Sequence, residues 1–151
     1  MNLTEHFTLA ELISSTYAQR HGIANVPIDA QITGNLYLLA RGLERVRRVL
    51  GRPIVVTSGY RCPEVNAALG GAPQSAHLHG LAADFRVSGM TPREVCQIIE
   101  QHADMVGFDK LIFEGTWTHI AFPDGASDPA GEVLTAHFSA GKTASYTRGI
   151  A

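Results

Sequence analysis

The chain has 151 residues, of which 45% are hydrophobic and 17% charged, a balance typical of one globular domain with a buried core. The net charge of −2 excludes a strongly basic surface of the kind that binds nucleic acid, and no apolar run reaches membrane-spanning length. Two cysteines, Cys62 and Cys96, are too few for a disulfide scaffold, so we expect two reduced thiols.

The first predicted helix begins at Thr8. Thr8 and Glu11 can form a capping box, and Phe7 and Leu12 can pack together as a hydrophobic staple. Gly22 is a typical C-terminal stop signal. These signals together predict one helix that occupies the chain from the cap to the glycine.

A longer amphipathic helix is predicted next. Asp29 is its expected N-cap, and Gly51 is expected to end it. Its apolar positions recur at intervals of three and four residues, and they are Ile32, Leu36, Leu39, Leu43, Val46 and Leu50. This stripe predicts a helix that packs one face on the core.

The rest of the chain predicts strands and two shorter helices. The expected strands cover residues 53–58, 82–87, 110–114, 117–122 and 133–138, and the helices start at Pro63 and after Thr91. The second of these helices is expected to bury Val95, Ile98 and Ile99. Gly115–Thr116 suits a two-residue hairpin turn with glycine first. Helices followed by mostly hairpin-linked strands predict an α+β fold.

The stretch from Ser75 to Asp84, S-A-H-L-H-G-L-A-A-D, offers an imidazole and a carboxylate on either side of Gly80. A second imidazole, His119, follows downstream in W-T-H. Strand alternation puts Asp84 and His119 on faces opposite the apolar residues of their strands. His77 is expected in a loop before the first of these strands. Two histidines and one aspartate suit zinc and leave one coordination position open.

These residues resemble the S-x-H-x-x-G-x-A-x-D signature and the later W-x-H of the zinc D-Ala-D-Ala carboxypeptidases. That family shares a metal core with lysostaphin-type peptidases and Hedgehog domains. An upstream segment, S-G-Y-R followed by Asn66, is also similar, and the resemblance covers about residues 7–122. It implies a Hedgehog/DD-peptidase-like α+β fold, with N-terminal helices packed on a small, mostly antiparallel sheet. It also implies Zn²⁺ held by His77, Asp84 and His119.

The remaining histidines are expected to be ordinary surface or core residues. They are His6, His21, His79, His102 and His137. Of these, His79 lies closest in sequence to a ligand, but the signature assigns the ligand position to His77. For Asp84, the alternative to metal binding is an ion pair with Arg86, which shares its strand face.

Hydrolysis also needs a carboxylate that takes a proton from the attacking water. The resemblance implies an acid three residues before the last ligand, where this sequence has Thr116. Glu114 is the candidate replacement. With a two-residue loop, Glu114 pairs with Trp117 and lies diagonal to His119 on the same face, with Cα atoms roughly 7–8 Å apart. The alternative for Glu114 is a solvated turn residue.

Four further residues receive candidate roles. The resemblance implies that Arg61 lies near the metal, where its guanidinium would bind a substrate carboxylate or steady the oxyanion. The alternative for Arg61 is a surface charge or a buried ion pair. Ser75 is expected to hydrogen-bond to the substrate or to its own loop, and Asn66 to brace that loop. Trp117 is expected to pack in the interior or to line the cleft.

The resemblance implies a zinc peptidase that acts on bacterial cell-wall peptide, at D-Ala-D-Ala or at a stem-peptide bond cut by endolysins. The first residues lack a basic segment followed by an apolar one, so we expect synthesis in the cytoplasm without a secretory signal. Release to the cell wall during phage lysis is one route to the substrate. We expect a monomer. The alternatives are a non-catalytic, metal-containing binding module and a phage structural or assembly protein with the same fold.

Overall fold

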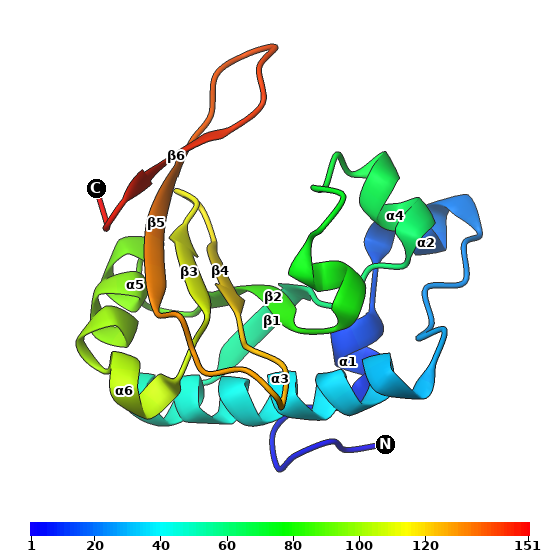
Figure 1. Cartoon of the computed structure of the whole chain (residues 1–151), viewed down its shortest axis with the longest axis horizontal. Helices are drawn as coiled ribbons and strands as arrows, with labels where there is room; N and C mark the ends of the chain where they lie inside the picture. Colours follow the sequence, from blue (N-terminus) through cyan, green and yellow to red (C-terminus); the bar gives the residue numbers. More distant parts are fainter.

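A computed structural model describes the whole chain, Met1–Ala151, as a six-stranded mixed sheet with helices along its edge and on one face (Figure 1). The helices are α1 (Leu9–Ile13), α2 (Thr16–His21), α3 (Ala30–Leu50), α4 (Pro63–Ala68), α5 (Pro92–Gln101) and α6 (Ala103–Val106), with a short 3₁₀ helix η1 (Ala76–His79). The strands are β1 (Ile54–Ser58), β2 (Ala82–Val87), β3 (Lys110–Phe113), β4 (Thr118–Ala121), β5 (Glu132–His137) and β6 (Ser145–Arg148). None of the helices is both long enough and apolar enough to cross a membrane.

The strand order is β1-β2-β4-β3-β5-β6, and every neighbouring pair is antiparallel except β3 and β5. The predicted α+β fold with a mostly antiparallel sheet is therefore confirmed. In Figure 1, α3 runs along the foot of the sheet, α5 and α6 lie to one side, and α1, α2 and α4 lie to the other. The loop between β5 and β6 projects from the body of the molecule.

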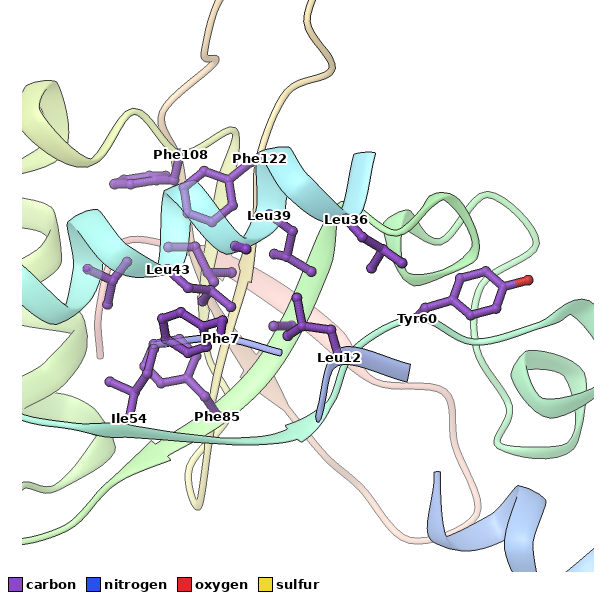
Figure 2. Close-up of a cluster of buried hydrophobic side chains, with 14 of the residues drawn as sticks. Phe7, Leu12, Leu36, Leu39, Leu43, Ile54, Tyr60, Phe85, Phe108 and Phe122 are labelled. Atoms are coloured by element: carbon purple, nitrogen blue, oxygen red, sulfur yellow. The ribbon is translucent and has the colours of Figure 1, made fainter. Parts of the chain in front are cut away.

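The core lies between α3 and one face of the sheet. All six residues of the predicted α3 stripe are buried, and Leu36, Leu39 and Leu43 point toward the sheet in Figure 2. They belong to one cluster of 26 buried residues that includes Phe85 of β2 and Phe7. Burying each such leucine or phenylalanine contributes about 1.5–3 kcal/mol. Both predicted ends of α3 are confirmed, since the Asp29 side chain caps it and Gly51 adopts a left-handed conformation.

The prediction of one helix between Thr8 and Gly22 is wrong, because two short helices occupy this stretch. The break falls at Ser14 and Ser15. The Ser15 hydroxyl accepts a hydrogen bond of 3.1 Å from the backbone N–H of Ala18 and so caps a new helix. A serine that bonds to nearby backbone favours an N-cap over continuation of the preceding helix. Gly22 still ends the second helix, as predicted.

Three elements were not predicted, namely η1, α6 and β6, and one buried position was assigned wrongly. Neither α6 nor β6 shows a clear apolar period; all four residues of β6 are exposed. In α5, Cys96 is buried with Val95 and Ile99, whereas Ile98 is only half-buried. Val95, Cys96 and Ile99 therefore form the buried face of α5, and Ile98 lies at the edge of that face.

Candidate metal centre and its cleft

Two of the predicted ligands are direct neighbours in the sheet. Asp84 of β2 pairs with His119 of β4 in an antiparallel register. Cross-strand partners share a face, and the core-facing neighbours Ala83 and Phe85 leave Asp84 on the opposite side. The Nδ1 atom of His119 lies 2.9 Å from Oδ1 of Asp84. The register of the sheet alone therefore brings these two side chains together.

The third predicted ligand, His77, lies on η1 rather than in a loop. The Ser75 hydroxyl accepts a 3.2 Å hydrogen bond from the backbone N–H of His77, and Gly80 ends the turn with φ +72°. A Cβ on Gly80 would lie 3.1 Å from the carbonyl oxygen of Ile32, so glycine also lets the turn approach α3. The side chain of His77 is buried, with Nε2 at 3.4 Å from Oδ1 of Asp84.

A backbone carbonyl fixes the orientation of the His77 ring. The Nδ1 atom of His77 lies 2.7 Å from the carbonyl oxygen of Gly59. Because a carbonyl only accepts, Nδ1 must carry the proton, which leaves the lone pair of Nε2 facing Asp84. This role of Gly59 was not predicted from the sequence. A Cβ there would collide with the carbonyl oxygen of Leu12, so the glycine of S-G-Y-R was the available signal.

The three side chains fit a zinc ion. Their ligand atoms, Nε2 of His77, Oδ1 of Asp84 and Nδ1 of His119, lie within 4.8 Å of one another. Two atoms that bind zinc at 2.0–2.1 Å in a tetrahedral arrangement lie about 3.4 Å apart. The structure therefore holds these atoms near the spacing that zinc requires. His79 lies outside this group and is exposed.

Arg61 holds the second oxygen of Asp84. Its Nη2 atom lies 3.3 Å from Oδ2 of Asp84, and its Nε donates to the hydroxyl of Ser58 at 3.2 Å. Arg61, and not the exposed Arg86, is thus the ion-pair partner of Asp84. Burial alone would raise the pKa of the Asp84 carboxyl, but its close contacts with His119 and His77 hold it well below its ordinary value.

A buried asparagine braces the segment that carries Arg61. The Nδ2 atom of Asn25 donates to the carbonyl oxygens of Ile13 and Tyr60 at 2.8 and 2.9 Å. Its Oδ1 accepts from the backbone N–H of Cys62 at 2.7 Å. The Asn25 amide thus holds the backbone on both sides of Arg61. No motif marked Asn25 in the sequence.

Two other asparagines hold the turns beside the cleft. Asn66 donates to the carbonyl oxygen of Ala72 at 3.0 Å and braces the loop before η1, as the sequence suggested. Asn35 of α3 donates to the carbonyl oxygen of His79 at 2.9 Å and ties η1 to the long helix. The sequence analysis did not single out Asn35, which resembles any polar residue of an amphipathic helix.

Glu114 lies where the two-residue hairpin was predicted to put it. Its backbone N–H donates to the carbonyl oxygen of Trp117 at 3.2 Å, and Gly115 has the positive φ, +83°, that the first loop position requires. Burial raises the pKa of the Glu114 carboxyl, and the Asp84 carboxylate raises it further. His119, the Trp117 side chain and Arg61 act in the opposite direction without cancelling the shift. A raised pKa suits a carboxylate that accepts and returns a proton.

A cleft of about 600 Å³ contains the three ligands together with Arg61 and Glu114. Ser75 and Trp117 also line it, so all seven predicted site residues meet in one place. The structure adds residues that the sequence analysis did not single out, among them Lys110, Ile112, Leu134 and Tyr146.

Two similarities to known proteins agree with this geometry. Residues 5–121 match the Peptidase M15 family. The zinc D-Ala-D-Ala carboxypeptidase of Streptomyces albus G is 32% identical over 89 aligned positions, and the match covers 55% of this chain and 33% of that protein. The chain thus spans about a third of the length of that curated relative. The family match includes every ligand of the zinc site, and the chain belongs to the M15 peptidases.

Proposed function

We propose that the chain hydrolyses an amide bond in bacterial peptidoglycan stem peptides, either as a D-Ala-D-Ala carboxypeptidase or as an endolysin-type endopeptidase. One observation carries this proposal: a three-residue zinc site and a half-buried carboxylate with a raised pKa share one open cleft. Three protein ligands leave a position for water, as catalytic zinc sites require. The substrate class is supported by the name of the similar Streptomyces enzyme.

His77, Asp84 and His119 would hold the zinc, which supplies Lewis-acid activation of water and of the scissile carbonyl. Glu114 takes the proton of the attacking water and later delivers it to the leaving amine. Its diagonal position relative to His119 and its raised pKa suit both transfers. The acid role that the resemblance assigns to the position of Thr116 thus passes to Glu114, two residues earlier.

Arg61 offers a hydrogen-bond donor to the substrate. Asp84 and Ser58 engage Nη2 and Nε of Arg61, which leaves Nη1 for the carbonyl oxygen that becomes negative during the reaction. Trp117 lines the same cleft and lies beside the Glu114 carboxyl, whose pKa its side chain lowers through a hydrogen bond.

Ser75 accepts a hydrogen bond within its own turn and can still donate one to the substrate. Its oxygen accepts from the backbone N–H of His77, and its hydroxyl hydrogen remains free to donate into the cleft. Ser75 therefore stabilises the turn that carries a ligand and also contacts the substrate.

Mass spectrometry of purified muropeptides, incubated with the zinc-loaded protein, tests the function. Loss of the terminal D-Ala identifies a carboxypeptidase, and cleavage inside the stem identifies an endopeptidase. Glu114→Gln, similar in size but unable to accept the proton, is the matched control and should leave the muropeptides intact. Intact muropeptides with fully zinc-loaded wild-type protein would contradict the proposal and favour a non-catalytic binding module.

A further inference from the structure

A row of residues leads from the metal centre across the sheet. His119 of β4 pairs with Ile112 of β3, and Ile112 pairs with Leu134 of β5. Neighbours in register share a face, so Ile112 and Leu134 lie on the same face as the ligand. Both line the cleft. The row forms an apolar floor that starts at the zinc site and leads toward β6.

A second row runs beside the first and ends at a tyrosine. Glu114 and Ala136 lie two residues beyond Ile112 and Leu134 on adjacent parallel strands, and Ala136 pairs with Tyr146 of β6. Glu114 and Tyr146 therefore flank the small side chain of Ala136 on the cleft face. Burial and, second, the charge of Glu114 raise the pKa of the Tyr146 phenol, which agrees with this placement.

This part of the cleft comes from the C-terminal strands. The match to the M15 family ends at residue 121, whereas Leu134 and Tyr146 follow it. The zinc site and Glu114 belong to the matched part. The cleft thus combines a family zinc centre with a wall that the family match does not include.

We propose that β5 and β6 extend the cleft into a groove for an extended oligopeptide, and that Tyr146 is a specificity-determining residue at its far end. This inference rests on the proposed function and specifies its substrate. The groove spans three strand spacings from β4 to β6, about 14 Å. An extended peptide advances about 3.3–3.6 Å per residue, so about four residues fit on this side of the zinc. A dipeptide would not reach Tyr146.

The residues along the groove match the chemistry of such a peptide. Ile112 and Leu134 offer apolar surface to its side chains. The phenol of Tyr146 offers a hydrogen bond to its backbone. The Tyr146 side chain is about half exposed, so a bound peptide has surface there to cover. A tyrosine on an edge strand without a role in binding would not discriminate between short and long peptides.

Binding can be measured separately from hydrolysis. Trp117 is the only tryptophan of the chain and lines the cleft, so its fluorescence reports occupancy. The zinc-loaded Glu114→Gln protein would be titrated with D-Ala-D-Ala and with a stem pentapeptide that ends in D-Ala-D-Ala. Adding Tyr146→Val, which retains strand propensity, should weaken pentapeptide binding about tenfold and leave the dipeptide unchanged. Tyr146→Phe should show the part of this loss that belongs to the hydroxyl.

Thr147→Ala is the matched control, because Thr147 is the next residue of β6 and faces the other way. It should bind both peptides as the parent does. Circular dichroism and thermal melts establish whether each variant is folded. If Tyr146→Val is unfolded, the comparison is made with Tyr146→Phe instead.

Equal losses for both peptides, or no loss for either, would overturn the role of Tyr146. Hydrolysis of the pentapeptide by the wild-type enzyme would then leave the proposed function standing. Conversely, selective pentapeptide binding that depends on Tyr146, without any hydrolysis by the wild type, would support the groove and contradict the peptidase function.

Discussion

The zinc site has two sides that are built in different ways. On the strand side, Asp84 and His119 stand opposite each other in the β2–β4 ladder. On the turn side, His77 projects from η1, a short turn that a few separate hydrogen bonds tie to its surroundings. Gly59 accepts from its ring, and Asn35 donates to the carbonyl oxygen of His79 at the end of η1.

The two sides therefore differ in redundancy. A ladder contains many backbone bonds, and losing one side-chain contact leaves the register intact. The turn side instead has few bonds to its surroundings: besides the contacts with Gly59 and Asn35, the backbone N–H of Arg61 donates to the carbonyl oxygen of His77 at 3.0 Å. A metal site assembled from both should thus be sensitive to distant substitutions on the turn side and tolerant of them on the strand side.

Removing a ligand should have the largest effect on zinc binding, and this effect should be equally large for the two sides. His77→Ala and His119→Ala should each reduce bound zinc from one ion per chain to background, because two remaining ligands hold zinc poorly. Plasma emission spectrometry measures the metal content, and His79→Ala is the matched control that should retain zinc. Full stoichiometry in either ligand variant would contradict the assignment.

Glu114→Gln should lower turnover by roughly 10²–10⁴, the usual contribution of general acid–base catalysis, without loss of metal. Glu114 lies at the end of the β3–β4 hairpin, so this variant tests the chemistry of the strand side with its geometry intact. Kinetics on muropeptides together with metal analysis make the measurement. Near wild-type turnover would transfer the role to another group.

Arg61 joins the two sides, because it lies on the turn-side segment and bonds to Asp84 of the strand side. Lysine retains the charge but not the forked geometry. Arg61→Lys should therefore lower turnover nearly as much as Arg61→Ala, by about 10²–10³. Thermal melts serve as the control. If both variants are unfolded, the ion pair is structural; if both are folded and fully active, Arg61 has no role in the chemistry.

Substitutions that remove contacts positioning the ligands should lower zinc affinity more on the turn side than on the strand side. Asn35→Ala removes the bond from α3 to η1 and should weaken zinc binding about 10–100-fold, the usual effect of losing a supporting contact. Thr57→Val is the strand-side counterpart, since it removes only the 3.2 Å bond from the threonine hydroxyl to the carbonyl oxygen of Asp84. It should change zinc affinity by less than about threefold, because the ladder still holds Asp84. Competition with a chromophoric chelator measures both, and equal effects would refute the difference in redundancy.

The last prediction concerns overall stability, and it rests on the buried thiol of Cys96, which lies 3.7 Å from the Thr118 hydroxyl of β4. Burial raises the pKa of Cys96 from 9.0 to about 11; a hydrogen bond from Thr118 opposes this shift and the charge of Glu100 adds to it. Because the folded pKa exceeds the unfolded one, the stabilisation is complete below pH 9.0 and is lost as pH rises through about 11. The loss amounts to about 2–3 kcal/mol. Urea unfolding across this range should show it, and Cys96→Ala should remove this part of the alkaline slope.

The strand side could be predicted almost completely from the sequence. Alternation placed Ala83 and Phe85 in the core and Asp84 on the open face, and the Gly115–Thr116 loop set the register that puts Glu114 near His119. These signals are local: a period of two residues and a turn with a characteristic glycine. A resemblance over spaced motifs then supplied the zinc.

The turn side and the far end of the cleft could not be predicted in this way. Asn25 and Asn35 act through side-chain bonds to backbone groups as far as 37 and 44 residues away, and no local pattern encodes such partners. Tyr146 lies on an edge strand with four exposed residues, where hydrophobic alternation carries no signal. The break between α1 and α2 depended on whether Ser15 would cap a new helix or continue the old one, which sequence patterns leave undecided.

The position of β3 in the sheet has a consequence for the nascent chain during synthesis. Although β3 precedes β4 and β5 in the chain, it lies between them in the sheet. A nascent chain that has emerged only to residue 121 already contains every zinc ligand, yet one edge of its β3 strand has no partner for the backbone N–H and C=O groups. Such an edge invites pairing with other chains. The newly made chain is thus open to self-association until β5 pairs with that edge.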